Sequence, residues 1–113
     1  LLLRSRSSNI ERCMMSAFVV VALDVNDEEK FGDYVANVAA SFAKYNVEVL
    51  AASDELDTIE GVAPSGRIVM LRFQSSEQAR QWYESPEYQR VLPLRHAAAD
   101  TRFMTTVKGL SEA

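Results

Sequence analysis

The fold of this chain is decided by the stretch from Arg72 to Tyr88, Arg-Phe-Gln-Ser-Ser-Glu-Gln-Ala-Arg-Gln-Trp-Tyr-Glu-Ser-Pro-Glu-Tyr. It begins at the end of an apolar, β-branched run that predicts a strand over 67–73. Ser75, with a glutamine three residues later, is typical of a helix N-terminus, because the serine hydroxyl can accept a free backbone N–H. Ser85 is a second such cap, and Pro86 after it fits the first position of a helix. The stretch therefore predicts a strand and then two capped helices.

The rest of the chain supplies the other elements. Further strands are predicted, and their ranges are 17–23, 47–52 and 101–108. Between the first two lies a long helix, which we expect Asn26 to cap, with Glu29 in a capping box, and Asn46 to end. Pro93 should kink or split the last helical segment, because proline lacks the N–H that a helix interior uses. The polar segment 53–66 is expected to be a loop or a strand extension.

Each helical segment has an apolar side, with residues three and four apart. On the first segment these positions are Phe31, Tyr34, Val35, Val38, Phe42 and Tyr45. On the second they are Ala79, Trp82 and Tyr83. On the third they are Tyr88, Val91, Leu92, Arg95 and Ala99. The third apolar side therefore includes a charged residue.

The order strand, helix, strand, strand, helix pair, strand is that of ferredoxin-like α+β folds. We expect a four-stranded antiparallel sheet with the helices on one face. The first strand is apolar on both faces, since Phe18 and Val20 alternate with Val19 and Val21. Monomers rarely expose so large an apolar surface. The sequence therefore predicts a homodimer, a dimeric α/β barrel whose sheets pack face to face and bury roughly 1,200–2,000 Å².

Composition limits the classes of function. The chain has 113 residues, 48% apolar and 25% charged, and a formal net charge of −4, which suits one globular domain. Its basic residues form no run, which argues against nucleic acid, and no apolar run reaches the roughly 18–20 residues of a membrane span. The single cysteine, Cys13, excludes an internal disulfide and favours a reducing, cytoplasmic location. The sequence lacks a phosphate-binding glycine loop and a Cys/His cluster, so we expect no cofactor and no metal.

We expect the single domain to span 15–110, with 111–113 as a tail. Residues 1–14 are rich in Arg and Ser, which superficially resembles a transit peptide. Met14 and Met15 stand directly before the first strand, however, so we interpret 1–14 as a disordered, upstream or vector-derived extension.

Short stretches spaced along the chain point to a family. They are Phe42-Ala43-Lys44-Tyr45, Ile59-Glu60-Gly61, Phe73-Gln74-Ser75, Tyr83-Glu84-Ser85-Pro86-Glu87-Tyr88-Gln89, Arg95 and Ala98-Ala99-Asp100. In this order, from about Phe18 to Gly109, the chain resembles the domain-of-unknown-function 1330 family. The resemblance implies the dimeric α/β-barrel superfamily, which includes cofactor-independent monooxygenases, dehalogenating or isomerising enzymes and proteins with no known activity. It thus implies a fold and a dimer rather than a reaction.

Three positions depart from the pattern of that family. Asn46-Val47 stands where two glycines are usual, Ala52-Ser53-Asp54 where Arg-Gly-Gly is usual, and Arg72 where an acidic residue is usual. A ligand that depends on those residues is therefore not implied for this chain.

Arg95 is the first candidate site residue, because a guanidinium on an apolar helix side can clamp a carboxylate, phosphate or enolate oxygen. The alternative is a structural ion pair with an acidic residue of its own or a partner chain. His96 is the single histidine and a candidate acid or base, or else a solvated side chain. Asp24 is a candidate base at the end of the first strand, or else part of a turn.

Tyrosines provide candidate ligand contacts. Tyr34, Tyr83 and Tyr88, at inward helical positions, can line a pocket and hydrogen-bond a polar ligand atom. They can equally be core side chains, and for Tyr45 and Trp82 we expect that role.

Three functions remain open from the sequence. The first is a homodimer that binds a small organic ligand between sheet and helices, with Arg95 and tyrosines as polar contacts. The second is a cofactor-free enzyme on a small carbonyl or phenolic compound, in which Arg95 stabilises an enolate. The third is a structural dimer without a ligand.

Overall fold

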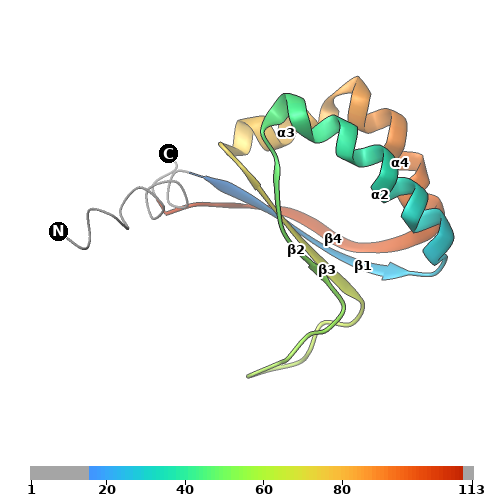
Figure 1. Cartoon of the computed structure of the whole chain (residues 1–113). Helices are drawn as coiled ribbons and strands as arrows, with labels where there is room; N and C mark the ends of the chain where they lie inside the picture. Colours follow the sequence, from blue (N-terminus) through green and yellow to red (C-terminus); the bar gives the residue numbers. More distant parts are fainter. Residues whose placement is uncertain (1–15, 111–113) are drawn as a thin grey trace.

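The computed structural model describes residues 16–110, and it shows helices covering one face of a sheet (Figure 1). In chain order the elements are β1 (Ala17–Val25), α2 (Glu28–Phe42), a 3-10 turn (Ala43–Tyr45), β2 (Glu48–Ser53), β3 (Arg67–Phe73), α3 (Ser76–Glu84), α4 (Pro86–Ala98) and β4 (Ala99–Lys108). The expected extension 1–14 and tail 111–113 lie outside the described residues.

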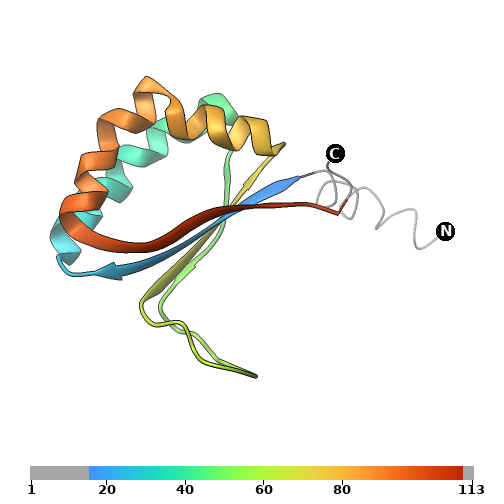
Figure 2. The same ribbon diagram turned by 180° about the vertical axis from the view of Figure 1, so that it is seen from behind.

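The sheet has the strand order β2-β3-β1-β4, and every neighbouring pair is antiparallel. All helices lie on the same side of it, as both views show (Figures 1 and 2). This is the predicted ferredoxin-like α+β fold. Among the helices of residues 16–110, none is long and apolar enough to cross a membrane.

The helix-facing side of the sheet is built from alternate residues of the central strand β1. Val19 pairs with Leu71 of β3 and with Thr106 of β4, and Val21 pairs with Val69 and Met104 in the same way. On this side Val19, Val21 and Leu71 are buried beneath the helices, and Val69 is partly buried. Because strand residues alternate between faces, this register directs the other half of β1 to the uncovered side.

A single hydroxyl forms the junction between α3 and α4. Ser85 Oγ donates to the carbonyl oxygen of Trp82 at 2.7 Å and accepts the backbone N–H of Tyr88 at 3.1 Å. It therefore ends one helix and begins the next, which is the role that the Ser85-Pro86 pair predicts. Ser75 likewise accepts the N–H of Gln78 at 3.0 Å, as predicted. These caps orient Trp82 and Tyr88 towards the sheet, where both are buried.

The start of α2 differs from the prediction by one residue. Asp27, and not Asn26, is the cap, and its carboxylate accepts the N–H of Lys30 at 3.0 Å. The reason is a long-range contact, since the N–H groups of Asn26 and Asp27 both donate to the carbonyl oxygen of Ala98 at the end of α4. That contact holds Asn26 at the end of the strand, where its amide donates to Asp100 at 3.4 Å. The expected capping box with Glu29 was therefore wrong.

The last helix is not split at Pro93. α4 continues through this residue from Pro86 to Ala98, so of the two expected effects, a kink or a split, the split does not occur. Pro93 and Gln89, the residue whose carbonyl would otherwise bond to position 93, are both exposed, and there water can bond the freed carbonyl. The opposite side of α4 is buried against the rest of the molecule, and this packing offsets the lost hydrogen bond.

Two departures from the family pattern have a local explanation. Asn46 has a left-handed backbone with φ 52°, a conformation that asparagine tolerates better than most residues, and it ends the helical region as predicted. Arg72 donates to Ser16 at 2.9 Å and forms an ion pair with Glu48 on the neighbouring strand β2. Each residue is thus accommodated by this chain's own surroundings.

The other face of the sheet is not covered by any described element (Figures 1 and 2). Its central strands place Phe18, Val20 and Met70 there, all only partly buried. On β4, Phe103 and Val107 are 44% and 48% exposed. We call this set, Phe18, Val20, Met70, Phe103 and Val107, the open face.

Gly66 closes the β2–β3 loop, residues 54–66, which extends away from the helices (Figures 1 and 2). Its φ is +85°, and a Cβ added there would lie 2.2 Å from the Leu23 carbonyl oxygen. Gly61 has a similar φ of +84°, but nothing lies within 4 Å of its added Cβ. A side chain at Gly61 would therefore cause backbone strain alone, whereas a side chain at Gly66 would also collide with Leu23.

We expect Gly61→Ala to lower the free energy of unfolding by about 1–2 kcal/mol, the cost of a side chain in a left-handed conformation. Gly66→Ala should lower it by about 1–3 kcal/mol more, because the collision with Leu23 forces the backbone to shift. Urea unfolding of both variants measures the difference. Equal losses would contradict the close packing of the loop end against β1.

Candidate functional site

Arg95 is the centre of the candidate site. Its side chain is buried, with 3% of the residue exposed. Nη1 donates to Tyr88 Oη at 2.7 Å and approaches Met104 Sδ at 3.3 Å, while Nη2 lies 3.5 Å from His96 Nε2. Within residues 16–110 Arg95 has no ion pair, and its buried Nε has no hydrogen-bond partner. A buried cation normally has an anionic partner, so this guanidinium is suited to an anion from outside the chain.

The phenols of Tyr34 and Tyr88 form a hydrogen-bonded pair next to the Arg95 guanidinium. Tyr34 Oη and Tyr88 Oη are 2.9 Å apart, and Tyr88 Oη accepts from Arg95. Burial raises the pKa of Tyr88, and it also raises the pKa of Tyr34 despite the hydrogen bond with Tyr88 and the nearby Arg95 charge. Both groups are therefore neutral hydrogen donors near pH 7 rather than bases. One bond between them uses one of their two hydrogens, which leaves the second for another acceptor.

Trp82 supports this group from α3. Its ring centroid lies 4.1 Å from that of Tyr88 and 5.3 Å from that of Phe73. Its indole N–H donates to Ser41 Oγ at 2.9 Å, and Ser41 donates in turn to the carbonyl oxygen of Val38. The expected core role of Trp82 agrees with this burial. Because the indole N–H is satisfied, Trp82 fixes the position of Tyr88 without an unpaired polar group.

One cavity, of about 360 Å³, lies between α3, α4 and the β4 side of the sheet. We call it the polar cavity, because Arg80, Arg95, His96 and Thr101 are among its lining residues. The buried hydroxyl of Thr101, like Arg95 Nε, has no hydrogen-bond partner within the described residues. None of the described residues that line it is Asp or Glu. The cavity thus offers hydrogen-bond donors and positive charge, and a small anion fits that chemistry.

A β-bulge brings Thr101 to this cavity. β4 pairs Phe103 with Ala22 but Thr101 with Leu23, so Arg102 is an extra residue in the ladder. Without the shift, the alternation that directs Met104 and Thr106 towards the helices would direct Arg102 there too. Arg102 instead pairs with Asp24 at 2.6 Å on the surface. We did not predict Thr101 as a site residue. The signal in the sequence was Arg102, because a charged residue two positions from Met104 would face the helices in a regular strand.

A second cavity, of about 130 Å³, lies between α2 and the β2 side of the sheet. We call it the apolar cavity, because its lining is aliphatic and aromatic apart from Arg95 and the sulfur of Met104. Val35 and Val49, which are 51% and 53% exposed, are also part of its lining. Val35, which belongs to the predicted apolar side of α2, thus lies beside the open side of this cavity rather than in the core.

The predicted site residues fall into different places. His96 and Tyr83 line the polar cavity, Tyr34 lines the apolar cavity, and Arg95 lines both. Tyr88 is fully buried and contacts Arg95 from behind. Among the described residues, no group of three or more His, Cys, Asp or Glu could hold a metal ion.

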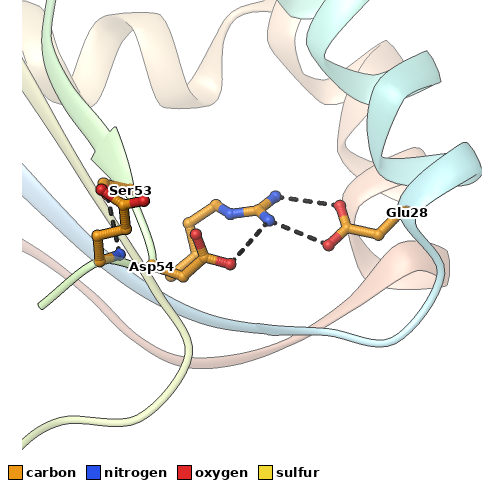
Figure 3. A network of polar contacts seen from close by, with 5 residues as sticks. Glu28, Ser53 and Asp54 are labelled. Atoms are coloured by element: carbon orange, nitrogen blue, oxygen red, sulfur yellow. Dashed lines mark hydrogen bonds and ion pairs between the residues drawn. The ribbon is translucent and has the colours of Figure 1, made fainter.

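Asp24 lies apart from these residues. It lines a small pocket with Glu28, Asp54 and Arg67, and it contributes to neither cavity beside Arg95. Arg67 there donates to Glu28 at 3.0 and 3.3 Å and to Asp54 at 3.3 Å. Figure 3 shows the Glu28 and Asp54 carboxylates on these bonds. These ion pairs join the start of α2 to the end of β2. This corner is thus a structural ion-pair network.

Comparison of sequences identifies a family for most of the chain. Residues 16–110 match the sequence model described as domain of unknown function (DUF1330). Among curated proteins, none matches the sequence.

Solved structures share the fold at low identity. A protein of unknown function from Rhodopseudomonas palustris is 12% identical, with a TM-score of 0.69, over 96% of this chain and 94% of that one. SnoaB, a cofactor-independent oxygenase from Streptomyces nogalater, is 13% identical, with a TM-score of 0.60 over 83% and 92%. A dimeric ferredoxin-like protein of unknown function from Bacteroides fragilis is 15% identical, with a TM-score of 0.55 over 82% and 95%. At such identity the likeness shows the fold alone.

The raised pKa values of the phenols predict a loss of stability in alkali. Above about pH 10 these tyrosines ionise in the unfolded chain but stay protonated in the native one. The native state then binds more protons, so the free energy of unfolding falls as pH rises, by up to about 1.4 kcal/mol per pH unit for each phenol.

Tyr34→Phe should make this fall shallower, since the phenylalanine has no proton to lose. Denaturant unfolding between pH 8 and pH 12, for wild type and variant, measures the slopes. Parallel slopes for the two proteins would show that burial does not keep Tyr34 protonated.

Proposed function

Because the chain belongs to the family described as domain of unknown function 1330, we propose its function from its own site: a homodimeric domain that binds a small organic anion beside Arg95. The observation that supports this is the buried guanidinium whose Nε has no partner in residues 16–110. We place the protein in the cytoplasm, in line with its single cysteine.

The Arg95 guanidinium has one edge suited to the anion. Nη1 is directed to Tyr88 and Met104, whereas, within the described part of the chain, Nε is unpartnered and Nη2 has only the 3.5 Å approach to His96. Nε and Nη2 together form the side of a guanidinium that binds a carboxylate with two parallel hydrogen bonds. Thr101, on the wall of the same cavity, provides a further hydroxyl.

We expect Arg95→Ala to weaken the binding of small carboxylates roughly 10–150-fold, since a hydrogen bond to a charged group is worth about 1.5–3 kcal/mol. Acetate, benzoate and 3-phenylpropionate, titrated by calorimetry, are the probes. Native mass spectrometry of the purified protein additionally detects a ligand that co-purifies.

Arg90→Ala is the matched control, because Arg90 is exposed on the same helix. It should leave the affinities unchanged. Unchanged affinity in a folded Arg95→Ala protein, or no binding of any probe by wild type, would reject the proposed site.

We also propose that the dimer forms through the open face. The apolar side chains there belong to β1, β3 and β4, and Phe103 and Val107 are about half exposed in the single chain. A second copy on a two-fold axis would cover this surface with the same surface of its own. The solved structure from Bacteroides fragilis, which shares the fold, is described as dimeric, and this supports a dimer.

Phe103→Glu should convert the dimer to a monomer, because it would place two carboxylates in an apolar interface. Val35→Glu is the control, since Val35 is exposed to a similar degree, 51%, but lies on the helix side of the sheet. Light scattering coupled to size-exclusion chromatography measures the native mass. A monomeric wild type, or a dimeric Phe103→Glu protein, would contradict the interface.

A cofactor-independent enzyme is the second candidate function. The observation that favours it is His96, whose ring nitrogen lies beside Arg95 on the wall of the polar cavity. A base next to a guanidinium can remove a proton from a carbonyl compound while the guanidinium stabilises the enolate oxygen. Conversion of a bound carbonyl or phenolic compound by wild type, lost in His96→Ala with binding retained, distinguishes this function from binding alone.

A further inference from the structure

The two cavities share a wall. Trp82, Arg95 and Met104 line both of them, although the polar cavity lies over the β4 side of the sheet and the apolar cavity over the β2 side. The two spaces therefore meet beneath the helices, near the middle of the covered face. The residues that the two linings share are therefore those that lie between the cavities.

Met104 is the movable part of that wall. It is partly buried on β4, and within residues 16–110 its sulfur has one hydrogen-bond contact, at 3.3 Å from Arg95 Nη1. Thioether sulfur is a weak acceptor, and methionine has three rotatable bonds beyond Cα. Rotation of Met104 can thus open a passage at small cost, whereas Trp82 is held by Ser41 and Arg95 by Tyr88.

The cavities differ in chemistry on either side of this wall. Arg95 Nε and Thr101 Oγ1, both buried and unpartnered within the described residues, belong to residues of the polar cavity. The apolar cavity has hydrocarbon walls and a volume of about 130 Å³. An apolar protein cavity of about 150 Å³ stays dry and holds a benzene ring. The second cavity is therefore close to the size of a phenyl group.

We propose that the ligand of the Arg95 site is amphipathic: a carboxylate bound by Arg95 and Thr101 in the polar cavity, joined to a phenyl-sized apolar group in the apolar cavity. This inference rests on the proposed function, since it requires the anion site. The residues that select the apolar part of the ligand are then those of α2 and β2 that line the apolar cavity.

A series of acids tests this inference in the intact chain of 113 residues. Acetate, benzoate, phenylacetate, 3-phenylpropionate and 4-phenylbutyrate are titrated by calorimetry. Affinity should rise roughly 10–100-fold above that of acetate at the acid whose ring reaches the apolar cavity, because the ring then leaves water.

Two variants separate the parts of the site. Thr101→Val, which removes the hydroxyl, should weaken all of the acids by a similar factor. Ala52→Phe, at an exposed strand position on the wall of the apolar cavity, should weaken only the ring-bearing acids that reach it. Ala52→Ser is the control, because serine is close in size to the native alanine, and it should leave the affinities of the series unchanged.

The outcomes distinguish the two proposals. If no acid binds wild type, the anion site and this inference both fail. If the acids bind but affinity is independent of the ring, or Ala52→Phe weakens acetate as much as 3-phenylpropionate, the anion site stands and the amphipathic ligand is rejected. The wild-type series decides this even if Ala52→Phe does not fold.

Discussion

The hydrogen bond from Arg95 to Tyr88 is the interaction on which the site depends. A buried guanidinium without a carboxylate is costly, and Tyr88 provides its one short hydrogen bond at 2.7 Å. Tyr88 is in turn fixed by Tyr34 from α2 and by the ring of Trp82 from α3. Through these contacts the Arg95 guanidinium is connected to all three helices, α2, α3 and α4. Its Nε and Nη2 side is the part that a ligand can bind.

Much of this arrangement could be predicted from the sequence, because the capping residues and apolar patterns that produce it are local. Ser75, Ser85 and Pro86 act within a few residues of themselves, so the helix pair could be predicted. The apolar side of α4 likewise indicates which of its residues are buried, including Arg95. These features need no knowledge of the distant chain.

What could not be predicted depends on contacts between distant residues. Asn26 lost the capping role to Asp27 because the end of α4 binds their N–H groups, some seventy residues away in sequence. Thr101 reaches the polar cavity through a bulge that forms where β4 pairs with β1, and the spacing of Arg102 from Met104 is the one trace of that bulge in the sequence. The pairing of Tyr34 with Tyr88 likewise arises only when α2 packs on α4.

The position of Trp82 has a spectroscopic consequence. It is the single tryptophan of the chain, it contributes to the walls of both cavities, and its indole lies against Tyr88 with its N–H bonded to Ser41. The indole emission of this protein therefore comes from one defined environment, and a guest in either cavity changes the surroundings of that one chromophore. The molecule has an intrinsic optical reporter of occupancy, so unlabelled compound libraries can be screened against it by fluorescence.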